Sequence, residues 1–169
     1  MSRALGFIEP QLLTSVDQPP QGDEWLHEIK HDGYRTLLVV DGKQARAYTR
    51  TGLDWTNLYP GIVSAAAKLN CRSAILDGEV IFQDERGASD FDALMSAIRW
   101  NPHKLIFYAF DLLHLDGKDL RDRPLLERRA KLNELLGLDE ASPLQLSEEF
   151  IGDAAAFFFP EGWGRLRSA

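Results

Sequence analysis

The sequence predicts an α+β fold with mostly antiparallel sheets and flanking helices. Three observations lead to this class: apolar and polar residues alternate in several short runs, Asp-Gly pairs separate neighbouring runs, and segments with helical signals lie between the pairs of runs. With 169 residues, 44% of them hydrophobic, the chain can bury a substantial core in one globular domain. A Rossmann or P-loop nucleotide site is not expected, because the sequence has neither Gly-x-Gly-x-x-Gly nor Gly-Lys-Ser/Thr.

The first elements are expected to be three consecutive strands. Residues 1–22 contain three prolines and are expected to be irregular. Trp25 to Lys30 alternates between apolar and polar residues, which predicts a half-buried strand that ends at an Asp-Gly turn. Tyr34 to Val40 and Gln44 to Thr49 are two further runs, and Asp41-Gly42 between them is a two-residue hairpin signal.

The remaining elements alternate between helices and strands. Pro60 lies near the first turn of an Ala-rich segment, which is typical of a helix. The expected elements are a helix over 60–69, a strand over 73–82, a helix over 90–99, a buried strand over 104–114 that ends at an Asp116-Gly117 turn, a helix from Pro124, a short strand over 144–147 and a short helix over 152–159.

Basic residues are concentrated between Arg121 and Lys131, on the helix expected from Pro124. A solvated helix face explains them at least as well as a nucleic-acid contact does. The net charge of −7 argues against strong autonomous DNA binding, because a duplex-binding surface needs cations against phosphates. The apolar stripe expected for this helix consists of Leu125, Leu126, Leu132, Leu135 and Leu136.

Composition also limits the cellular compartments in which the protein is expected. No run approaches the about 18 consecutive apolar residues of a membrane span, and the N-terminus lacks a signal-peptide core, so we expect a cytoplasmic protein without a membrane partner. The single cysteine, Cys71, excludes an internal disulfide and is expected to act as a small buried hydrophobe. The four scattered histidines do not support a zinc site.

Lys30 is expected at the mouth of a sheet, between an apolar strand and the Asp32-Gly33 turn, with Glu28 and Arg35 nearby. This setting suits a nucleophilic amine, because desolvation and neighbouring cations help a lysine to lose its proton. The alternative is a solvated hairpin tip, since Lys, Asp, Gly and Arg are ordinary residues of turns and edge strands.

Two later strands carry further candidates. Asp77 and Glu79 are expected to share one face of a strand, where an acidic pair needs a cation, a metal or a hydroxyl. Gly78 between them indicates the close approach of another backbone or a ligand, unless the segment is an Asp-Gly turn. The aromatic run over 107–110 is ordinarily explained by core packing.

Together these segments resemble the motifs of the covalent nucleotidyltransferases, which include ATP-dependent DNA ligases, RNA ligases and mRNA capping enzymes. The similarity is closest to bacterial end-joining DNA ligases, runs from about Pro10 to Glu149, and implies their ATP-grasp-like nucleotidyltransferase core. The matching segments, in the family's order, are Lys30-His31-Asp32-Gly33-Tyr34-Arg35, Thr49-Arg50-Thr51-Gly52, Leu76-Asp77-Gly78-Glu79-Val80 and Phe107-Tyr108-Ala109-Phe110-Asp111-Leu112-Leu113.

The resemblance implies roles for individual residues. Lys30 would attack the α-phosphorus of ATP, expel pyrophosphate and hold AMP, and Phe110 would stack on the purine. Asp32 would orient the lysine and the metal, and Glu79 would contact the ribose or the metal. The residues implied in nucleotide binding are Glu28, Arg35, Arg50, Glu79 and Phe110, and those implied in Mg²⁺ binding are Asp32, Glu79 and Glu161.

The chain departs from the family near its end, where only Glu161-Gly162 match a fourth motif that reads Glu-Gly-x-Val-x-Lys. We therefore expect an irregular segment (1–22), a partial adenylation domain (23–160) and a short divergent tail (161–169), without the OB-fold domain. The expected partners are nicked or broken DNA, bound weakly, and other repair proteins or a separate OB-fold chain. Two alternatives are a non-catalytic nucleotide-binding remnant and a relative of RNA ligases or capping guanylyltransferases.

Overall fold

The computed structural model describes residues 5–12, 25–137, 139–151 and 165–168. Its strands are β1 (Leu26–Lys30), β2 (Tyr34–Asp41), β3 (Gln44–Thr49), β4 (Ser73–Ile81), β5 (Ile106–Leu115), β6 (Lys118–Asp119), β7 (Leu144–Leu146), β8 (Glu149–Ile151) and β9 (Arg165–Ser168). Its helices are α1 (Pro60–Ala66), α2 (Phe91–Trp100) and α3 (Leu125–Leu136), with 3₁₀ turns η1 (Thr56–Leu58) and η2 (Pro102–Lys104).

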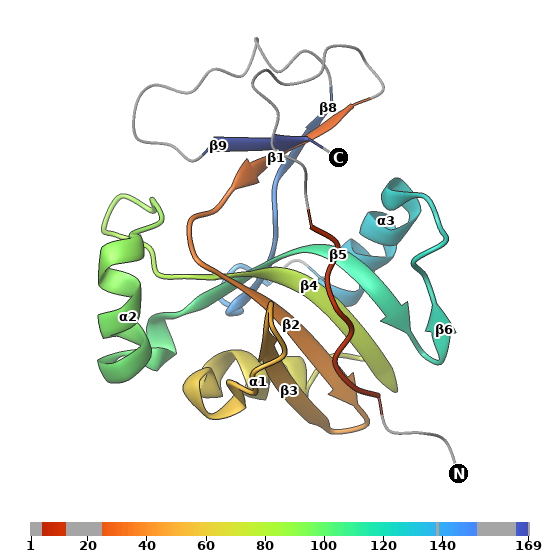
Figure 1. Cartoon of the computed structure of the whole chain (residues 1–169), viewed down its shortest axis with the longest axis horizontal. Helices are drawn as coiled ribbons and strands as arrows, with labels where there is room; N and C mark the ends of the chain where they lie inside the picture. The colour runs from red at the N-terminus through yellow and green to blue at the C-terminus, as the bar shows by residue number, and fades with distance from the viewer. Residues whose placement is uncertain (1–4, 13–24, 138, 152–164, 169) are drawn as a thin grey trace.

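The strands form two sheets (Figure 1). The larger sheet has six strands in the order β3-β2-β4-β5-β6, with β7 paired to β5, and the smaller sheet has the order β8-β1-β9. Every pairing is antiparallel except that of β5 with β7. The chain therefore has the predicted α+β architecture, and the strand that ends at Lys30 belongs to a different sheet from the strand that starts at Tyr34.

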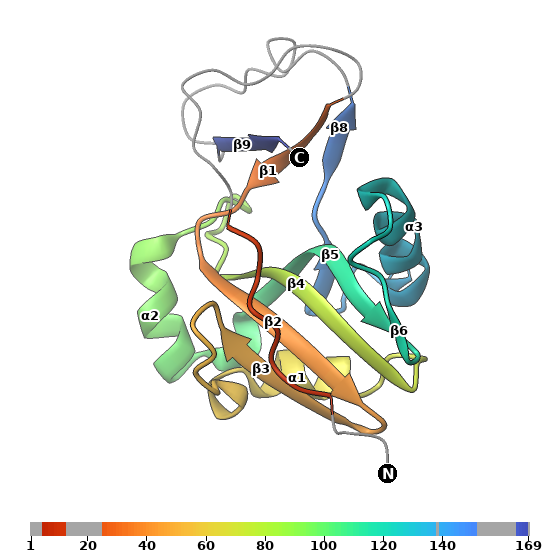
Figure 2. The ribbon, with the colours of Figure 1, turned by 45° about the vertical axis from the view of Figure 1, so that its right-hand side comes forward.

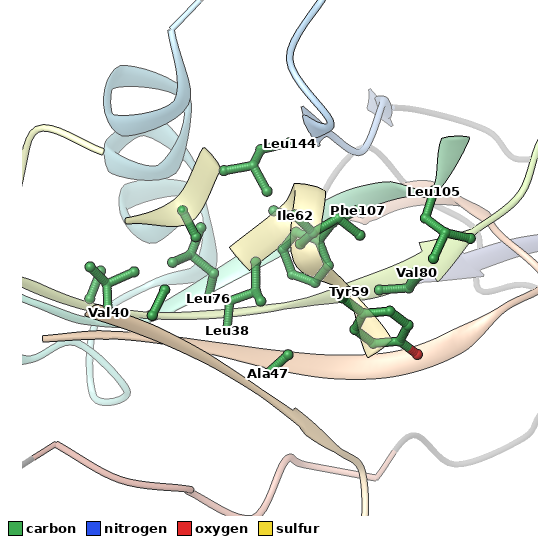
Figure 3. Packing of buried hydrophobic residues seen from close by; sticks show 14 of the residues in the cluster. Leu38, Val40, Ala47, Tyr59, Ile62, Leu76, Val80, Leu105, Phe107 and Leu144 are labelled. Carbon is green, nitrogen blue, oxygen red and sulfur yellow. The ribbon is translucent and has the colours of Figure 1, made fainter. Parts of the chain in front are cut away.

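The main hydrophobic core lies on one face of the larger sheet. Side chains from β2, β4 and β5 meet Ile62 of α1 there (Figure 3). Leu94 of α2 and Leu132 of α3 belong to the same cluster. A smaller cluster on other positions of the same strands packs against Leu5 and Ile8 of the N-terminal segment. The larger sheet is thus covered on both faces, which is why its central strands read as nearly continuous apolar runs.

Element boundaries follow the predictions with small corrections. Asp41 pairs with Gln44, so the β2–β3 turn consists of Gly42 and Lys43, one residue later than predicted, and Gly42 has a positive φ of 63°. Helix α1 ends at Ala66 rather than at residue 69, because the amides of Lys68 and Leu69 donate to carbonyls three residues back and tighten the chain into a turn.

Helix α3 differs from its predicted stripe. Leu126 is 56% exposed, whereas Arg129 is buried together with Leu132. Arg129 lies four residues after Leu125 and three before Leu132, so helical geometry places it on the inner face. The predicted stripe was wrong at Leu126 because residue type, rather than spacing, suggested it.

Two other expectations meet the limits of what the structure describes. The helix expected over 152–159 lies outside the described residues, and residues 5–12 of the expected irregular segment carry no helix or strand.

Cys71 is half-buried beside the core, and burial raises the pKa of its thiol. None of the described helices is long and apolar enough to cross a membrane.

Gly78 is required by packing in the core. A Cβ atom at this position would lie 2.4 Å from the Phe107 ring and 2.5 Å from the Tyr108 carbonyl oxygen. The prediction that another group approaches this glycine closely is confirmed, and the approaching groups are an aromatic ring and a backbone of the neighbouring strand.

We expect Gly78→Ala to lower the free energy of unfolding by roughly 1–3 kcal/mol, because the added methyl group overpacks the contact with Phe107. Urea denaturation would measure the change. The matched control is Gly61→Ala in α1, where the nearest atoms are 4.0 Å from the added carbon and alanine favours the helix. Equal effects at the two glycines would contradict this account.

Candidate active site

Lys30 is the last residue of β1, and its side chain is accessible to solvent. Its ammonium group lies 3.7 Å from the Asp32 carboxylate, and the two side chains are 45% and 68% exposed. An exposed ion pair at this distance contributes little to stability. Lys30 and Asp32 are therefore available to a ligand rather than committed to the fold.

The loop that follows Lys30 is attached to the larger sheet. The His31 ring stacks on Tyr108, with centroids 4.1 Å apart and planes 20° apart, and the Gln83 amide donates to the Tyr108 hydroxyl. Gly33 lies so close to β4 that a Cβ atom there would be 2.2 Å from the Val80 carbonyl oxygen. Lys30 thus directly precedes a short loop that a ring stack and a glycine contact hold against the larger sheet.

Arg35 extends over the face of the larger sheet beside this loop. Its Nε and Nη2 donate to the two carboxylate oxygens of Asp77 at 3.1 and 2.8 Å, and its guanidinium carbon lies 5.5 Å from the centre of the Phe110 ring. Burial opposes the charge of Arg35, but hydrogen bonding and attraction to Asp77 outweigh it, so the pKa of Arg35 is raised. The forked contact fixes the guanidinium in place.

The predicted acidic pair lies on β4. Asp77 and Glu79 stand two residues apart in regular pairing with β2, where Glu79 is opposite Arg35, so they share one face of the strand. The buried Asp77 meets the cation that the sequence calls for, since it binds Arg35. Among the residues that the structure describes, no group of three or more His, Cys, Asp or Glu side chains could hold a metal ion.

A second ion pair lies beside the first. Asp111 on β5 is the register partner of Asp77, and Arg128 of α3 donates to its two oxygens at 2.7 and 2.9 Å. Each of these neighbouring carboxylates therefore has its own guanidinium, which offsets their repulsion and the cost of their burial.

Phe110 lies at an irregularity between β4 and β5. The register passes from Asp77 opposite Asp111 to Gly78 opposite Ala109, which leaves Phe110 as the extra residue of a β-bulge. A bulge turns a side chain away from the regular alternation, and here the ring is 7% exposed and faces Arg35.

Glu28 is buried against an arginine from α3. The guanidinium of Arg129, 3% exposed, donates to Glu28 and to Glu149, which are themselves register partners in β1 and β8. The interpretation of the basic run as a solvated face or a nucleic-acid contact is therefore wrong for Arg128 and Arg129, because carboxylates bind both guanidinium groups.

The structure brings some predicted residues together and leaves others apart. Arg35, Glu79 and Phe110 lie around Asp77, close to the loop over residues 31–33 that follows Lys30. Arg50 is exposed and directly follows β3, at the same end of the β2–β3 pairing as Arg35. Glu161 lies outside the described residues.

Sequence reasoning missed several residues that support this site. The sequence assigns no role in the site to His31, Tyr108, Asp111 or Arg129: the first and third only lie in matching motifs, Tyr108 is explained by packing, and Arg129 belongs to the basic run. A signal was present for Arg129, whose spacing from Leu125 and Leu132 already placed it on the inner face of α3.

Comparison with known proteins identifies a matching family and several similar proteins. A family model described as an ATP dependent DNA ligase domain matches residues 11–156. The multifunctional non-homologous end joining protein LigD of Pseudomonas aeruginosa is 41% identical over 148 residues, which are 87% of this chain and 18% of that protein. The SPbeta prophage-derived DNA ligase-like protein LigB of Bacillus subtilis is 32% identical over 131 residues, 76% of this chain and 47% of that one.

Solved structures give the same result. The ligase domain of Mycobacterium tuberculosis LigD matches with a TM-score of 0.73 and 31% identity, over 88% of this chain and 49% of that chain. A mycobacterial DNA ligase D complexed with ATP and MES matches with a TM-score of 0.72 and 32% identity, over 86% and 48% of the two chains. This chain therefore spans less than half the length of these relatives.

The buried ion pair of Arg35 and Asp77 is expected to matter for stability. We expect Asp77→Asn to lower the free energy of unfolding by about 3 kcal/mol or more, because it leaves a guanidinium that is 16% exposed without its counter-ion. Urea denaturation at neutral pH would measure the loss.

The matched control is Asp119→Asn, which makes the same change in another forked pair. Hydrogen bonds from Arg121 lower the pKa of Asp119 to about 2, but both side chains are about half exposed, so we expect little change in stability. A comparable loss at both aspartates would show that burial of the Asp77 pair is not the cause.

Proposed function

Because this chain belongs to the family of ATP-dependent DNA ligase domains, of the end-joining type, we propose that it transfers AMP from ATP to Lys30. In this step the Lys30 Nζ attacks the α-phosphorus, a phosphorus–nitrogen bond forms, and the bond to the pyrophosphate oxygen breaks. The amine gives up a proton, and pyrophosphate leaves with the displaced electron pair. The observation that carries the proposal is the position of Lys30, accessible at the end of β1 and directly before a loop that contacts the larger sheet near Arg35, Glu79 and Phe110.

The proposed nucleotide site lies on the face of the sheet next to that loop. Phe110 would contact the purine, and Arg35 and Arg50 would bind ribose or phosphate oxygens, to which guanidinium groups are well suited. Glu28, from the strand that carries Lys30, would border the nucleotide. ATP as the nucleotide agrees with the family and with the mycobacterial ligase D solved with ATP.

The carboxylates of this chain suit a Mg²⁺ ion that is also bound by substrate phosphates. Mg²⁺ is usually bound by one or two carboxylates together with substrate phosphates, and Asp32 and Glu79 offer two carboxylates without a complete ligand group among the described residues. Asp32 and Glu79 would hold the ion, with Glu161 as a further candidate. When bound, the ion would neutralise phosphate charge and align pyrophosphate.

We further propose broken or nicked DNA as the substrate of the later steps, since the Pseudomonas relative is an end-joining protein. The net charge of −7 opposes the approach of a duplex, and Arg128 and Arg129 are already used in internal ion pairs. Another repair protein or an OB-fold chain would then supply the cationic contact. A cytoplasmic location agrees with this substrate and with a single cysteine.

Lys30→Ala should abolish covalent labelling by ATP labelled at the α-phosphate, read on a denaturing gel and mapped by mass spectrometry. Lys30→Arg should also fail, because a guanidinium stays protonated. Lys43→Ala is the matched control, since Lys43 lies in the hairpin turn at the other end of β2 and should label normally. Label on Lys43, Lys68 or Lys104 would contradict the assignment, label from GTP alone would favour capping chemistry, and no label would favour a remnant.

Phe110→Ala should weaken ATP binding by about 10- to 100-fold if the ring stacks on the purine. Calorimetric titration would measure the affinity. Phe107→Ala is the control, because that ring is fully buried in the core and its loss should lower the melting temperature while the folded protein keeps its affinity for ATP. An unchanged affinity with a lower melting temperature in Phe110→Ala would assign that ring to packing alone.

A further inference from the structure

Arg129 joins the two sheets at the base of the candidate site. Its Nη1 donates to Glu28 of β1 and, at 2.9 Å, to the Phe110 carbonyl oxygen of β5. Its Nε donates to Glu149 of β8, and its Nη2 donates at 2.6 Å to the carbonyl oxygen of Ser147, which follows β7. One buried side chain therefore contacts two strands of the smaller sheet and two segments of the larger one.

This connection matters because β1 has no pairing with the larger sheet. Its hydrogen-bonded neighbours are β8 and β9, and Figures 1 and 2 show the smaller sheet to one side of the larger sheet, with α3 beside β5. Within the described residues, the backbone passes between the two sheets at residues 31–33 and 147–148. The relative position of Lys30 and Phe110 therefore depends on contacts between side chains.

We propose that Arg129 is a positioning residue for AMP transfer. It binds the carboxylate of Glu28, two residues before Lys30 on the same strand, and the backbone of Phe110, the ring proposed to contact the purine. It thereby fixes the distance between the nucleophile and the bound nucleotide without touching either. This inference rests on the proposed function of Lys30.

Only an arginine can make this set of contacts. The guanidinium group carries five N–H donors in one plane, and the four contacts use both donors of Nη1, the donor of Nε and one of Nη2. A lysine would keep the charge next to Glu28 and Glu149, but its single ammonium group cannot reach acceptors on both sides of the junction. Arg129→Lys therefore separates positioning from charge.

Arg128 provides a matched control from the next position of α3. It is also a largely buried arginine in a forked contact, but its hydrogen bonds go to Asp111 of β5 and to the Arg123 carbonyl oxygen. Arg128→Lys should disturb the same helix and the same strand β5 while leaving the junction of the two sheets intact.

The test compares the wild-type chain, Arg129→Lys and Arg128→Lys by single-turnover labelling with ATP and by hydrogen exchange. We expect Arg129→Lys to lower the maximal labelling rate per folded molecule by roughly 10- to 100-fold, with a smaller change in the ATP concentration for half-maximal rate. Amides of residues 26–30 should exchange faster, while those of β2 and β4 keep their protection. Arg128→Lys should show neither effect.

The outcomes distinguish the positioning role of Arg129 from the proposed AMP transfer to Lys30. A normal labelling rate in Arg129→Lys, or a loss that Arg128→Lys matches, would overturn the positioning role. A slower rate with uniformly faster exchange across both sheets would assign Arg129 to general stability and would also overturn it. Failure of the wild-type chain to label Lys30 would contradict the proposed function instead, and faster exchange confined to residues 26–30 would still establish that Arg129 holds this strand.

Discussion

The burial of three arginines against carboxylates is the constraint on which the rest of this structure depends. Arg35 binds Asp77, Arg128 binds Asp111, and Arg129 binds Glu28 and Glu149, all at or near the meeting point of the two sheets. A charge removed from water is costly unless a partner and further hydrogen bonds replace the water. Each guanidinium here has such partners. These ion pairs form a polar centre of the domain in which the side chains hold defined positions.

This polar centre determines where the chemistry can occur. The strand that carries Lys30 and the strand that carries Phe110 come from different sheets, and the charged pair of Glu28 and Arg129 connects them. Non-directional apolar contacts would permit small sliding movements, whereas forked hydrogen bonds specify both distance and angle. A group-transfer site needs such a well-defined contact between the sheets, because misplacement of a reacting group by about 1 Å can lower the rate a hundredfold.

Much of the fold could be predicted because periodicity reports which face of a strand or helix is buried. The strands over 34–41, 44–49 and 73–81 have alternating or continuous apolar patterns and distinct turn residues, and the structure differs from their predicted ends by no more than about one residue. The division of the strands into two sheets could not be predicted, because β1 pairs with residues 121 to 141 positions later in the sequence and a local pattern carries no information about that pairing. In the site, the motif residues were visible by type, but Arg129 was not, since hydrophobic patterning treats every buried arginine as a surface residue.

The pairing of β1 has a consequence for the order in which the molecule can assemble. Strands β2 to β7 take their partners from one another within residues 34–146, whereas β1 pairs with segments at 149–151 and 165–168. During synthesis from the N-terminus, the larger sheet can therefore form before β8 and β9, the partners of β1, have left the ribosome. Closing this long loop has an entropic cost that a finished sheet and helix α3 would already have reduced by bringing the ends together. The strand that carries Lys30 would accordingly be the last part of the domain to form, and the proposed AMP transfer would be unavailable to a nascent chain.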